Sequence, residues 1–363
     1  MKVPYWQVDL GEDIPLLVKS VAEQRSFSMG RYCEEFETTL VDLLGVKYAI
    51  GVSSGSDAIL ISLMALGIGR GDKVLVQDRS WIAAANAIAI LGAIPIYVDV
   101  RADSPVISVT DLIDKFTPDC KALVVVHMNG RHGEFLKVLQ FCKMNYLPMI
   151  EDAAQALGSK IKNQPLGTFG EIGCFSLSIA KIVGSGQGGF CVTNSQPLGN
   201  KISLMRIHGT ADPFAAKWES IGFNFRLTDF HAAIANNQIK YLAERIQRAN
   251  EVMNLYREGL KDSSHISLIE LDFPSGEVGP YVEATVTKSR EKLIEFAKFR
   301  NVEIRPFYPS TSQAKYLGGF GSTPNADMYA KTGIYLPSGP AISNKQVAYV
   351  CEVVQDFFNE FEN

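Results

Sequence analysis

The chain has 363 residues, with 35 lysines and arginines against 39 acidic residues and a formal net charge of −4 at pH 7. This length exceeds one ordinary domain core and favours one large domain and one small domain. Charges of both signs are scattered without a basic stripe, which argues against nucleic acid or a membrane surface as a partner.

The N-terminal residues carry no apolar segment of the kind found in secretory signal peptides, so a cytoplasmic location is expected. Residues 81–98 carry no charge and approach transmembrane length. Because Asn86, Gly92 and Pro95 interrupt this run, it predicts a buried helix followed by a strand. The six cysteines are widely spaced and form no CxxC pair, which favours reduced thiols and no metal site.

Between residues 48 and 193, short apolar runs rich in β-branched residues alternate with helical patterns. Such unbroken apolar strands predict a mostly parallel sheet covered by helices on both faces, an α/β fold. Ligands of these sheets bind beyond the carboxyl ends of the strands. The predicted strands are 48–52, 73–77, 94–100, 122–127, 148–152, 173–178 and 189–193, and predicted helices between them include 57–66, 82–91 and 134–144.

A long helical pattern over residues 228–260 follows the sheet and predicts a link between two domains. Beyond it, 281–287 and 302–307 are predicted strands, 291–299 is a predicted helix between them, and 344–358 is a predicted final helix. We therefore expect a large domain over residues 1–245 and a smaller C-terminal α/β domain over residues 246–363.

Small residues fill the segment 53–57, Ser-Ser-Gly-Ser-Asp, between a predicted strand and a predicted helix. Backbone N–H groups near Gly55 and Ser56 could therefore approach an anion such as a phosphate at the helix N-terminus. The alternative is a plain helix start with Ser56 as the N-cap and no ligand.

A second glycine-rich segment, residues 184–189, satisfies the pattern G-x-G-x-x-G. It does not connect a strand to a helix, since a predicted strand follows it, and a dinucleotide site is therefore rejected. Its glycines are better suited to a tight turn or to a close approach of the backbone to a bulky group.

Asp152 ends an apolar strand, and Lys181 follows the next one. Taken singly, Asp152 could be a helix N-cap or part of a core salt bridge, and Lys181 could extend to the surface. Taken together, a lysine and an acid at neighbouring strand ends are what pyridoxal phosphate chemistry requires. The lysine holds the cofactor covalently, and the acid keeps its pyridine nitrogen protonated.

Other polar and aromatic residues have two possible roles. Trp81 could be a core or domain contact, or it could stack on a flat cofactor. His127, at a strand end, could be a ligand contact or a structural histidine. Ser176 is an ordinary strand serine unless it faces a phosphate, and Asn224 could be a loop residue ahead of a helix capped near Thr228.

The order of these motifs resembles the DegT-type sugar aminotransferases, which are fold type I pyridoxal phosphate enzymes. The resemblance covers nearly the whole chain. Its residues lie in the segments 32–37, 51–58, 151–155 (Glu-Asp-Ala-Ala-Gln), 174–181 and 222–229 (Gly-Phe-Asn-Phe-Arg-Leu-Thr-Asp).

This resemblance implies a role for each matching residue. Lys181 would hold the cofactor and move the proton, and Asp152 would pair with the ring nitrogen. The remaining implied cofactor contacts are Gln155 at the ring hydroxyl, Trp81 on the ring face, Gly55, Ser56 and Ser176 at the phosphate, and Asn224 at the phosphate of a partner subunit. The active unit would then be a homodimer with active sites at the subunit interface.

The resemblance further implies transfer of an amino group, with glutamate as donor, to a nucleotide-linked 4-keto-6-deoxy sugar. Alternatives are a 3-keto sugar as acceptor, a sugar dehydratase of the same fold, or a regulatory protein that binds the cofactor without turnover. Dehydratases of this kind typically replace the lysine by histidine, and this chain keeps Lys181. Three segments depart from the family pattern: Gln187 replaces an acid, and residues 127–130 and 309–312 differ from the common motifs.

Overall fold

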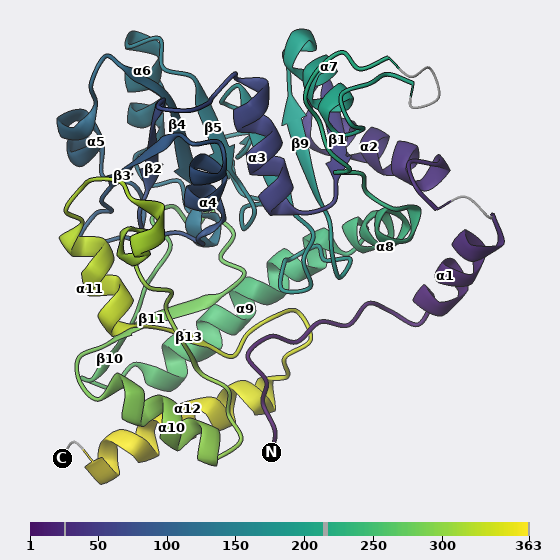
Figure 1. Ribbon diagram of the computed structural model, residues 1–363. Coiled ribbons are helices and arrows are strands. Elements are labelled where there is room, and N and C mark those ends of the chain that lie inside the picture. The colour runs from purple at the N-terminus through teal and green to yellow at the C-terminus, as the bar shows by residue number, and fades with distance from the viewer. Residues whose placement is uncertain (25–26, 213–216, 362–363) are drawn as a thin grey trace.

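The computed structural model describes residues 1–24, 27–212 and 217–361. Its centre is a seven-stranded sheet of order β1-β9-β8-β5-β4-β2-β3 (Figure 1). The strands are β1 (Tyr48–Val52), β2 (Lys73–Gln77), β3 (Ile94–Val98), β4 (Cys120–Val126), β5 (Met149–Asp152), β8 (Ile172–Ser176) and β9 (Gly189–Thr193). All seven predicted strands are present, some of them shorter than expected.

The sheet is parallel from β3 through β8, and β9 runs antiparallel to both of its neighbours, β8 and β1. The prediction of a mostly parallel α/β sheet is therefore confirmed. Because parallel strands share one direction, the carboxyl ends of β2, β4, β5 and β8 meet at a single edge of the sheet.

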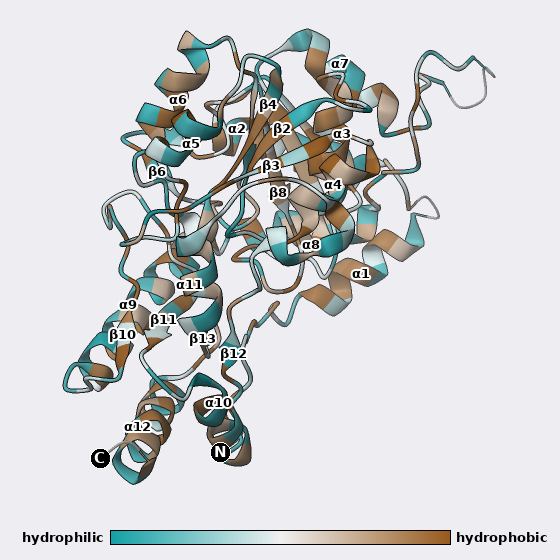
Figure 2. Ribbon diagram, turned by 60° about the vertical axis from the view of Figure 1, so that its left-hand side comes forward, coloured by the Kyte–Doolittle hydropathy of each residue, from teal (hydrophilic) through white to brown (hydrophobic). Residues whose placement is uncertain are grey.

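Helices cover both faces of the sheet, as the unbroken apolar strands require (Figure 2). One face packs against α3 (Gly55–Ala65), α4 (Ala83–Ile90) and α7 (Gln196–Met205). The opposite face of the sheet packs against α5 (Val109–Lys115), α6 (Phe135–Met144), α2 (Arg31–Leu44) and α8 (Asp229–Ile239). Helix α1 (Ile14–Glu23) packs against α8.

The long helical pattern is two helices, because α8 ends at Ile239 and α9 (Leu242–Leu260) begins after a short break. The Thr228 side chain accepts a hydrogen bond from the His231 N–H and caps α8, as predicted.

The C-terminal part has its own core and an antiparallel sheet of order β10-β11-β13-β12. The predicted strand 302–307 is reduced to two residues, because only Arg305 and Pro306 pair with β13. Its elements are β10 (Ile266–Leu268), β11 (Val282–Val286), α10 (Arg290–Phe299), β12 (Arg305–Pro306), α11 (Pro324–Thr332), β13 (Gly333–Leu336) and α12 (Asn344–Phe361).

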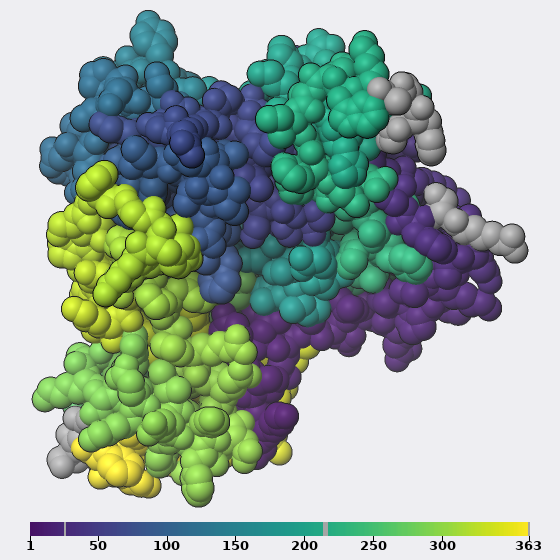
Figure 3. Space-filling view, in the orientation of Figure 1, coloured from purple at the N-terminus to yellow at the C-terminus, as the bar shows by residue number. Residues whose placement is uncertain are grey.

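The N-terminal residues run beside this C-terminal part (Figures 1 and 3). Val3 bridges to Val302 and lies in the C-terminal core, and Trp6 bridges to Ser338. The C-terminal part in turn reaches the large sheet, because the Tyr97 N–H of the edge strand β3 donates to the Phe320 carbonyl at 3.0 Å. The two parts are thus joined by crossing segments, and the expected boundary at residue 245 falls inside α9.

Candidate active site

The edge where the parallel strands end brings the predicted lysine and acid together. Asp152 is the last residue of β5, and it pairs in register with Cys174 of the neighbouring strand β8. Lys181 lies in the turn that follows β8, with its N–H donating to the Ser178 carbonyl at 3.0 Å. The two charges interact electrostatically across this edge.

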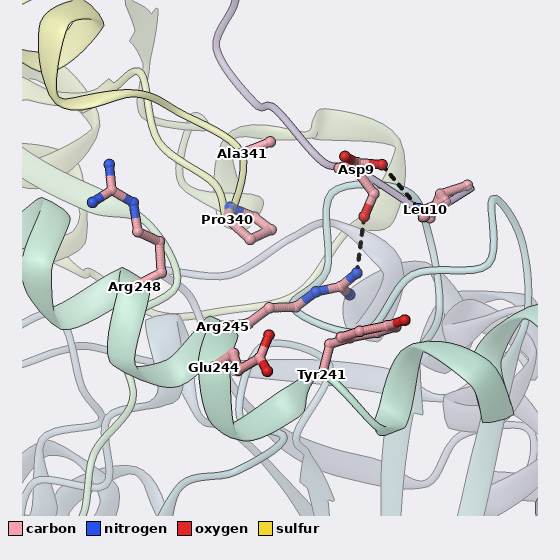
Figure 4. A pocket seen from close by; sticks show the side chains of 9 residues that line it. Asp9, Leu10, Tyr241, Glu244, Arg245, Arg248, Pro340 and Ala341 are labelled. Carbon is pink, nitrogen blue, oxygen red and sulfur yellow. Dashed lines mark hydrogen bonds between the residues drawn. The ribbon is translucent and has the colours of Figure 1, made fainter. Parts of the chain in front are cut away.

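The turn that carries Lys181 is held on both sides of the lysine. The Tyr281 hydroxyl donates to the carbonyl of Ala180, and the Arg245 guanidinium donates to the carbonyl of Ile182 at 2.8 Å. Arg245 comes from α9 and also reaches the Asp9 carbonyl at 3.1 Å, beside a cavity of about 530 Å³ (Figure 4). These contacts fix the backbone on both sides of the lysine.

The surroundings shift both ionisable groups toward their neutral forms. Burial lowers the pKa of Lys181 to about 8, although the charge of Asp152 opposes this shift. Burial also raises the pKa of Asp152, whereas the Ala154 N–H, which donates to the carboxylate at 3.1 Å, and the charge of Lys181 oppose it. A lysine with a lowered pKa can act as a nucleophile and a base near neutral pH.

A cradle for an anion lies next to this pair, at the start of α3. An added Cβ on Gly55 would lie 2.8 Å from the Cβ of Ser176, and one on Gly189 would lie 2.6 Å from the Gly55 nitrogen. The Ser54 hydroxyl, not that of Ser56, accepts from the Asp57 N–H at 3.0 Å and caps the helix. The exposed Ser56 therefore lies in the first helical turn, where backbone N–H groups suit a phosphate.

The glycine cluster does not form a dinucleotide site, because strand β9 follows it. Gly188 has a φ of +124° and bridges to Ser54. The cluster thus brings its backbone close to the phosphate-type loop. Gln187 is exposed beside it, and its carbonyl accepts from the Ser185 hydroxyl at 2.7 Å.

His127 is a buried structural residue. Its Nε2 lies 2.8 Å from a carboxylate oxygen of Glu151, which also accepts from the backbone N–H groups of Gly167, Phe169 and Gly170. Of the two roles considered for His127, the structure favours the structural one. It supports Glu151 and, through it, the end of β5 that carries Asp152.

The remaining candidates on this edge are Trp81 and Gln155. Trp81 follows β2 and is 54% exposed, and its ring meets that of Tyr308 edge-on at 4.8 Å. The Gln155 side-chain oxygen accepts from the Asn129 N–H at 2.8 Å. Trp81 thus presents a large exposed ring where a flat ligand could lie, and Gln155 is tied to the neighbouring strand end.

Asn224 lies apart from these residues, on an exposed segment next to the first strand. Its side-chain oxygen accepts from Arg226 at 2.8 Å, and Arg226 bridges to Val52 at the end of β1. Nearby Ile221 and Phe223 are also exposed. A role for Asn224 in a partner's site therefore stays a prediction.

Sequence reasoning missed two residues that shape the site, Tyr281 and Arg245. Both reach the lysine turn from segments far away in the chain, Tyr281 from just before β11 and Arg245 from α9. No local pattern marks them, because their role depends on the tertiary contact alone.

The fold and the paired strand ends define a pyridoxal-phosphate-dependent enzyme of fold type I. The donor set fits that cofactor, since a nucleophilic lysine, a buried acid and an anion cradle without bulky side chains lie at one edge of the sheet.

Comparison with known proteins agrees with this assignment. Residues 8–355 match the model of the DegT/DnrJ/EryC1/StrS aminotransferase family. The GDP-perosamine synthase of Escherichia coli O157:H7 is 34% identical over 339 residues, which cover 92% of each chain. The UDP-N-acetyl-3-dehydro-alpha-D-glucosamine 3-aminotransferase of Acidithiobacillus ferrooxidans is 28% identical over 95% of this chain and 94% of its own.

Solved structures give the same result. The aminotransferase TlmJ from Streptoalloteichus hindustanus superposes with a TM-score of 0.94 at 26% identity, over 99% of this chain and 100% of its own. The chain belongs to the DegT/DnrJ/EryC1/StrS aminotransferase family. It is a sugar aminotransferase, and its cofactor is pyridoxal phosphate, as the sequence predicted.

Two further features can be stated for the described residues. No helix among them is long and apolar enough to cross a membrane. Within the part of the chain that the structure describes, there is no group of at least three His, Cys, Asp or Glu side chains that could hold a metal ion. The six cysteines are free and buried.

Proposed function

We propose that this enzyme transfers an amino group from glutamate to a nucleotide-linked 4-keto-6-deoxy sugar in the cytoplasm. The observation that carries the transfer chemistry is the juxtaposition of Lys181 and Asp152 at adjacent strand ends, with the pKa of the lysine lowered to about 8. The choice of sugar is supported by the similarity to a GDP-perosamine synthase, which extends over most of both chains.

When bound, pyridoxal phosphate would supply the electron sink that lets an amino group move from donor to acceptor. Lys181 would hold the cofactor between turnovers, and its Nζ would move the proton as a general acid and base. Asp152 would keep the pyridine nitrogen protonated, which requires the charged carboxylate despite its buried position.

The other predicted contacts complete the site. Gly55, Ser56 and Ser176 bind the phosphate at the start of α3, and Gln155 contacts the ring hydroxyl. Trp81 covers the ring face. The close approach of Gly55 to Ser176 supports this placement, because it brings the start of α3 and the serine hydroxyl together at one point.

The enzyme acts as a homodimer in this proposal, with Asn224 reaching the phosphate in the partner subunit. The exposure of Asn224 and of its neighbours Ile221 and Phe223 supports this contact. The large domain over residues 1–245 then carries the cofactor, and the small domain over 246–363 closes the acceptor side.

A direct test is incubation of the purified protein with glutamate and a panel of 4-keto and 3-keto nucleotide sugars. We expect an amino sugar and 2-oxoglutarate from the 4-keto-6-deoxy acceptor. Formation of the 3-amino product would move the assignment to the alternative acceptor, and water loss without amine formation would identify a dehydratase. Lys181→Ala should abolish both transfer and the absorbance of the lysine-bound cofactor.

A further inference from the structure

Asn129 is a buried asparagine between the central sheet and the C-terminal part of the molecule. It follows β4, is 1% exposed, and has a φ of 51° and a ψ of 35°. Asparagine is one of the few residues that adopt this left-handed conformation readily. It lies in the segment 127–130, where the sequence departs from the family pattern, so the resemblance implies no role for it.

The Asn129 side chain forms a closed pair of hydrogen bonds with the backbone of one residue in the C-terminal part. Its amide oxygen accepts from the Tyr281 N–H at 2.9 Å, and its amide nitrogen donates to the Tyr281 carbonyl at 2.8 Å. The same nitrogen donates to the Glu283 carboxylate at 3.1 Å. Because the nitrogen faces two acceptors and the oxygen faces a donor, an amide in this orientation satisfies every partner.

Tyr281 connects this anchor to the catalytic lysine. Its hydroxyl donates to the carbonyl of Ala180, the residue before Lys181, and its side chain lines the same small pocket as the lysine. Tyr281 is 5% exposed, so its backbone has few alternative partners for the bonds that Asn129 supplies. The hold of Asn129 on the Tyr281 backbone therefore decides where the tyrosine hydroxyl meets the lysine turn.

Asn129 also fixes the side chain of Gln155. The Asn129 backbone N–H donates to the Gln155 side-chain oxygen at 2.8 Å. Because a backbone N–H only donates, the Gln155 atom that faces it is the oxygen, and the amino group of the glutamine points away from Asn129. Gln155 lines the pocket that contains Lys181, so this amino group is the end that can donate to the ring hydroxyl of the cofactor.

A second anchor lies two residues further on and keeps this segment docked without the Asn129 amide. Arg131 is 1% exposed, donates to the Glu283 carboxylate, and donates through another nitrogen to the Ile269 carbonyl at 2.7 Å. These are charge-assisted or buried bonds that do not pass through Asn129. Loss of the Asn129 amide should therefore release the Tyr281 backbone while the segment stays in place.

We propose that Asn129 is a positioning residue of the transfer reaction. Through Tyr281 it sets the place of the turn that carries Lys181, and through its own N–H it sets the direction of the Gln155 amino group. One asparagine thus aligns the lysine amine with the donor to the ring hydroxyl. This inference rests on the proposed roles of Lys181 and Gln155 and names the residue that holds them in register.

The first test replaces Asn129 by glycine, which keeps the left-handed backbone and its N–H but removes the amide. The visible circular dichroism of the loaded protein, divided by the amount of bound cofactor, reports whether the ring is held at one tilt. We expect this signal to fall at least about twofold in Asn129→Gly. We also expect kcat to fall at least about tenfold, with a change of less than about threefold in the KM for glutamate, because alignment is lost and not binding.

The second test follows the route through the tyrosine. Tyr281→Phe removes the hydroxyl that reaches Ala180 and should lower kcat about fivefold. The matched control is Tyr329→Phe, because Tyr329 is another buried tyrosine of the C-terminal part, and its hydroxyl donates to the Ala102 carbonyl at 3.1 Å. The control should keep both readouts within about twofold of wild type. The double variant of Asn129→Gly and Tyr281→Phe should stay within about twofold of Asn129→Gly, since both changes act on one contact.

A merely structural role for Asn129 would lower the unfolding temperature and leave the dichroism and kcat at their wild-type values, which would overturn the inference. Equal losses in Tyr281→Phe and Tyr329→Phe, or losses that multiply fully in the double variant, would overturn it too. Asn129→Asp keeps the size of the side chain and removes only the donor nitrogen, so it supplies the same comparison where the glycine variant does not fold. Failure of the proposed function is distinct: Lys181→Ala would then keep the absorbance of the lysine-bound cofactor, whatever the Asn129 variants show.

Discussion

Gly55 shows how a missing side chain creates a binding feature. It begins α3 next to Ser176, and an added Cβ would come within 2.8 Å of the serine Cβ. Gly55→Ala should leave the fold intact but crowd the cradle, and we expect the affinity of the apoprotein for pyridoxal phosphate to fall at least about tenfold. A titration followed by absorbance measures this.

The control for this variant is Gly69→Ala. Gly69 has nothing within 4 Å of an ideal Cβ, so the added methyl group meets open space. Its cofactor affinity should equal that of wild type. If both alanine variants bind the cofactor equally well, the phosphate does not lie against Gly55.

The lysine gives a prediction about pH. A lysine amine reacts only when neutral, and its ordinary pKa is about 10.4. Burial lowers the pKa of Lys181 to about 8, so the neutral form predominates at a lower pH. The rate at which apoprotein takes up pyridoxal phosphate should therefore rise with pH, reach half its maximum near pH 8 and then level off.

Stopped-flow absorbance at a series of pH values would follow this uptake. An Asp152→Asn variant removes the charge that favours the protonated lysine, so its midpoint should move to lower pH. A rate that keeps rising to pH 10 in the wild type would show that Lys181 is solvated like a surface lysine.

At the scale of elements, one carboxylate joins the end of β2 to the small domain. Asp78 is fully buried and accepts from the Thr311 hydroxyl at 2.6 Å and from the Ser312 N–H and hydroxyl, both at 2.7 Å. The Thr323 hydroxyl donates to it as well. Residues 309–312, which depart from the family pattern, therefore contribute hydroxyl groups that hold the small domain to the end of β2.

Asp78→Ala removes the carboxylate that accepts from these donors, and only the Thr311 hydroxyl keeps another acceptor, the Asp78 backbone carbonyl at 3.2 Å. At about 1–3 kcal/mol for each unsatisfied group, we expect a loss of at least about 3 kcal/mol in the free energy of unfolding, measured by urea denaturation. Limited proteolysis should then cleave first between residues 309 and 323. Asp114→Ala, which changes an exposed acid on α5, should alter stability by less than about 0.5 kcal/mol.

The elements differ in how well the sequence predicts them. The seven sheet strands are short runs of apolar residues bounded by turn residues, so local pattern identifies them. The short strand β10 and the break at Lys240 have no such signal, because pairing and packing decide them. In the site, Lys181 and Asp152 follow from their positions after strands, whereas Tyr281 and Ala180 are 101 positions apart and their hydrogen bond depends on the fold.

At the scale of the whole molecule, the segment before α8 bears on assembly. Trp218, Ile221 and Phe223 are 68%, 75% and 57% exposed, a high exposure for three large apolar residues within six positions. Asn224 follows directly. A second copy of the chain could cover this surface and receive Asn224 at its phosphate site, as we propose.

Mixing two inactive variants tests this shared site. Asn224→Asp should place a negative charge against the partner's phosphate and abolish activity, and Lys181→Ala is inactive for lack of the amine. A hybrid dimer of the two has one site with both defects and one intact site, because Lys181 and Asn224 of each site come from different chains. After random exchange of subunits, about a quarter of the wild-type activity should return.

The matched control mixes Lys181→Ala with Asp152→Asn. Lys181 and Asp152 of each site come from the same chain. Every site in the hybrid dimer therefore keeps one defect, and no activity should return. Recovery in the first mixture alone shows that Asn224 serves the partner subunit. If neither mixture recovers although sedimentation shows a dimer that exchanges subunits, each chain completes its site without Asn224 of the partner, and the exposed apolar segment has another use.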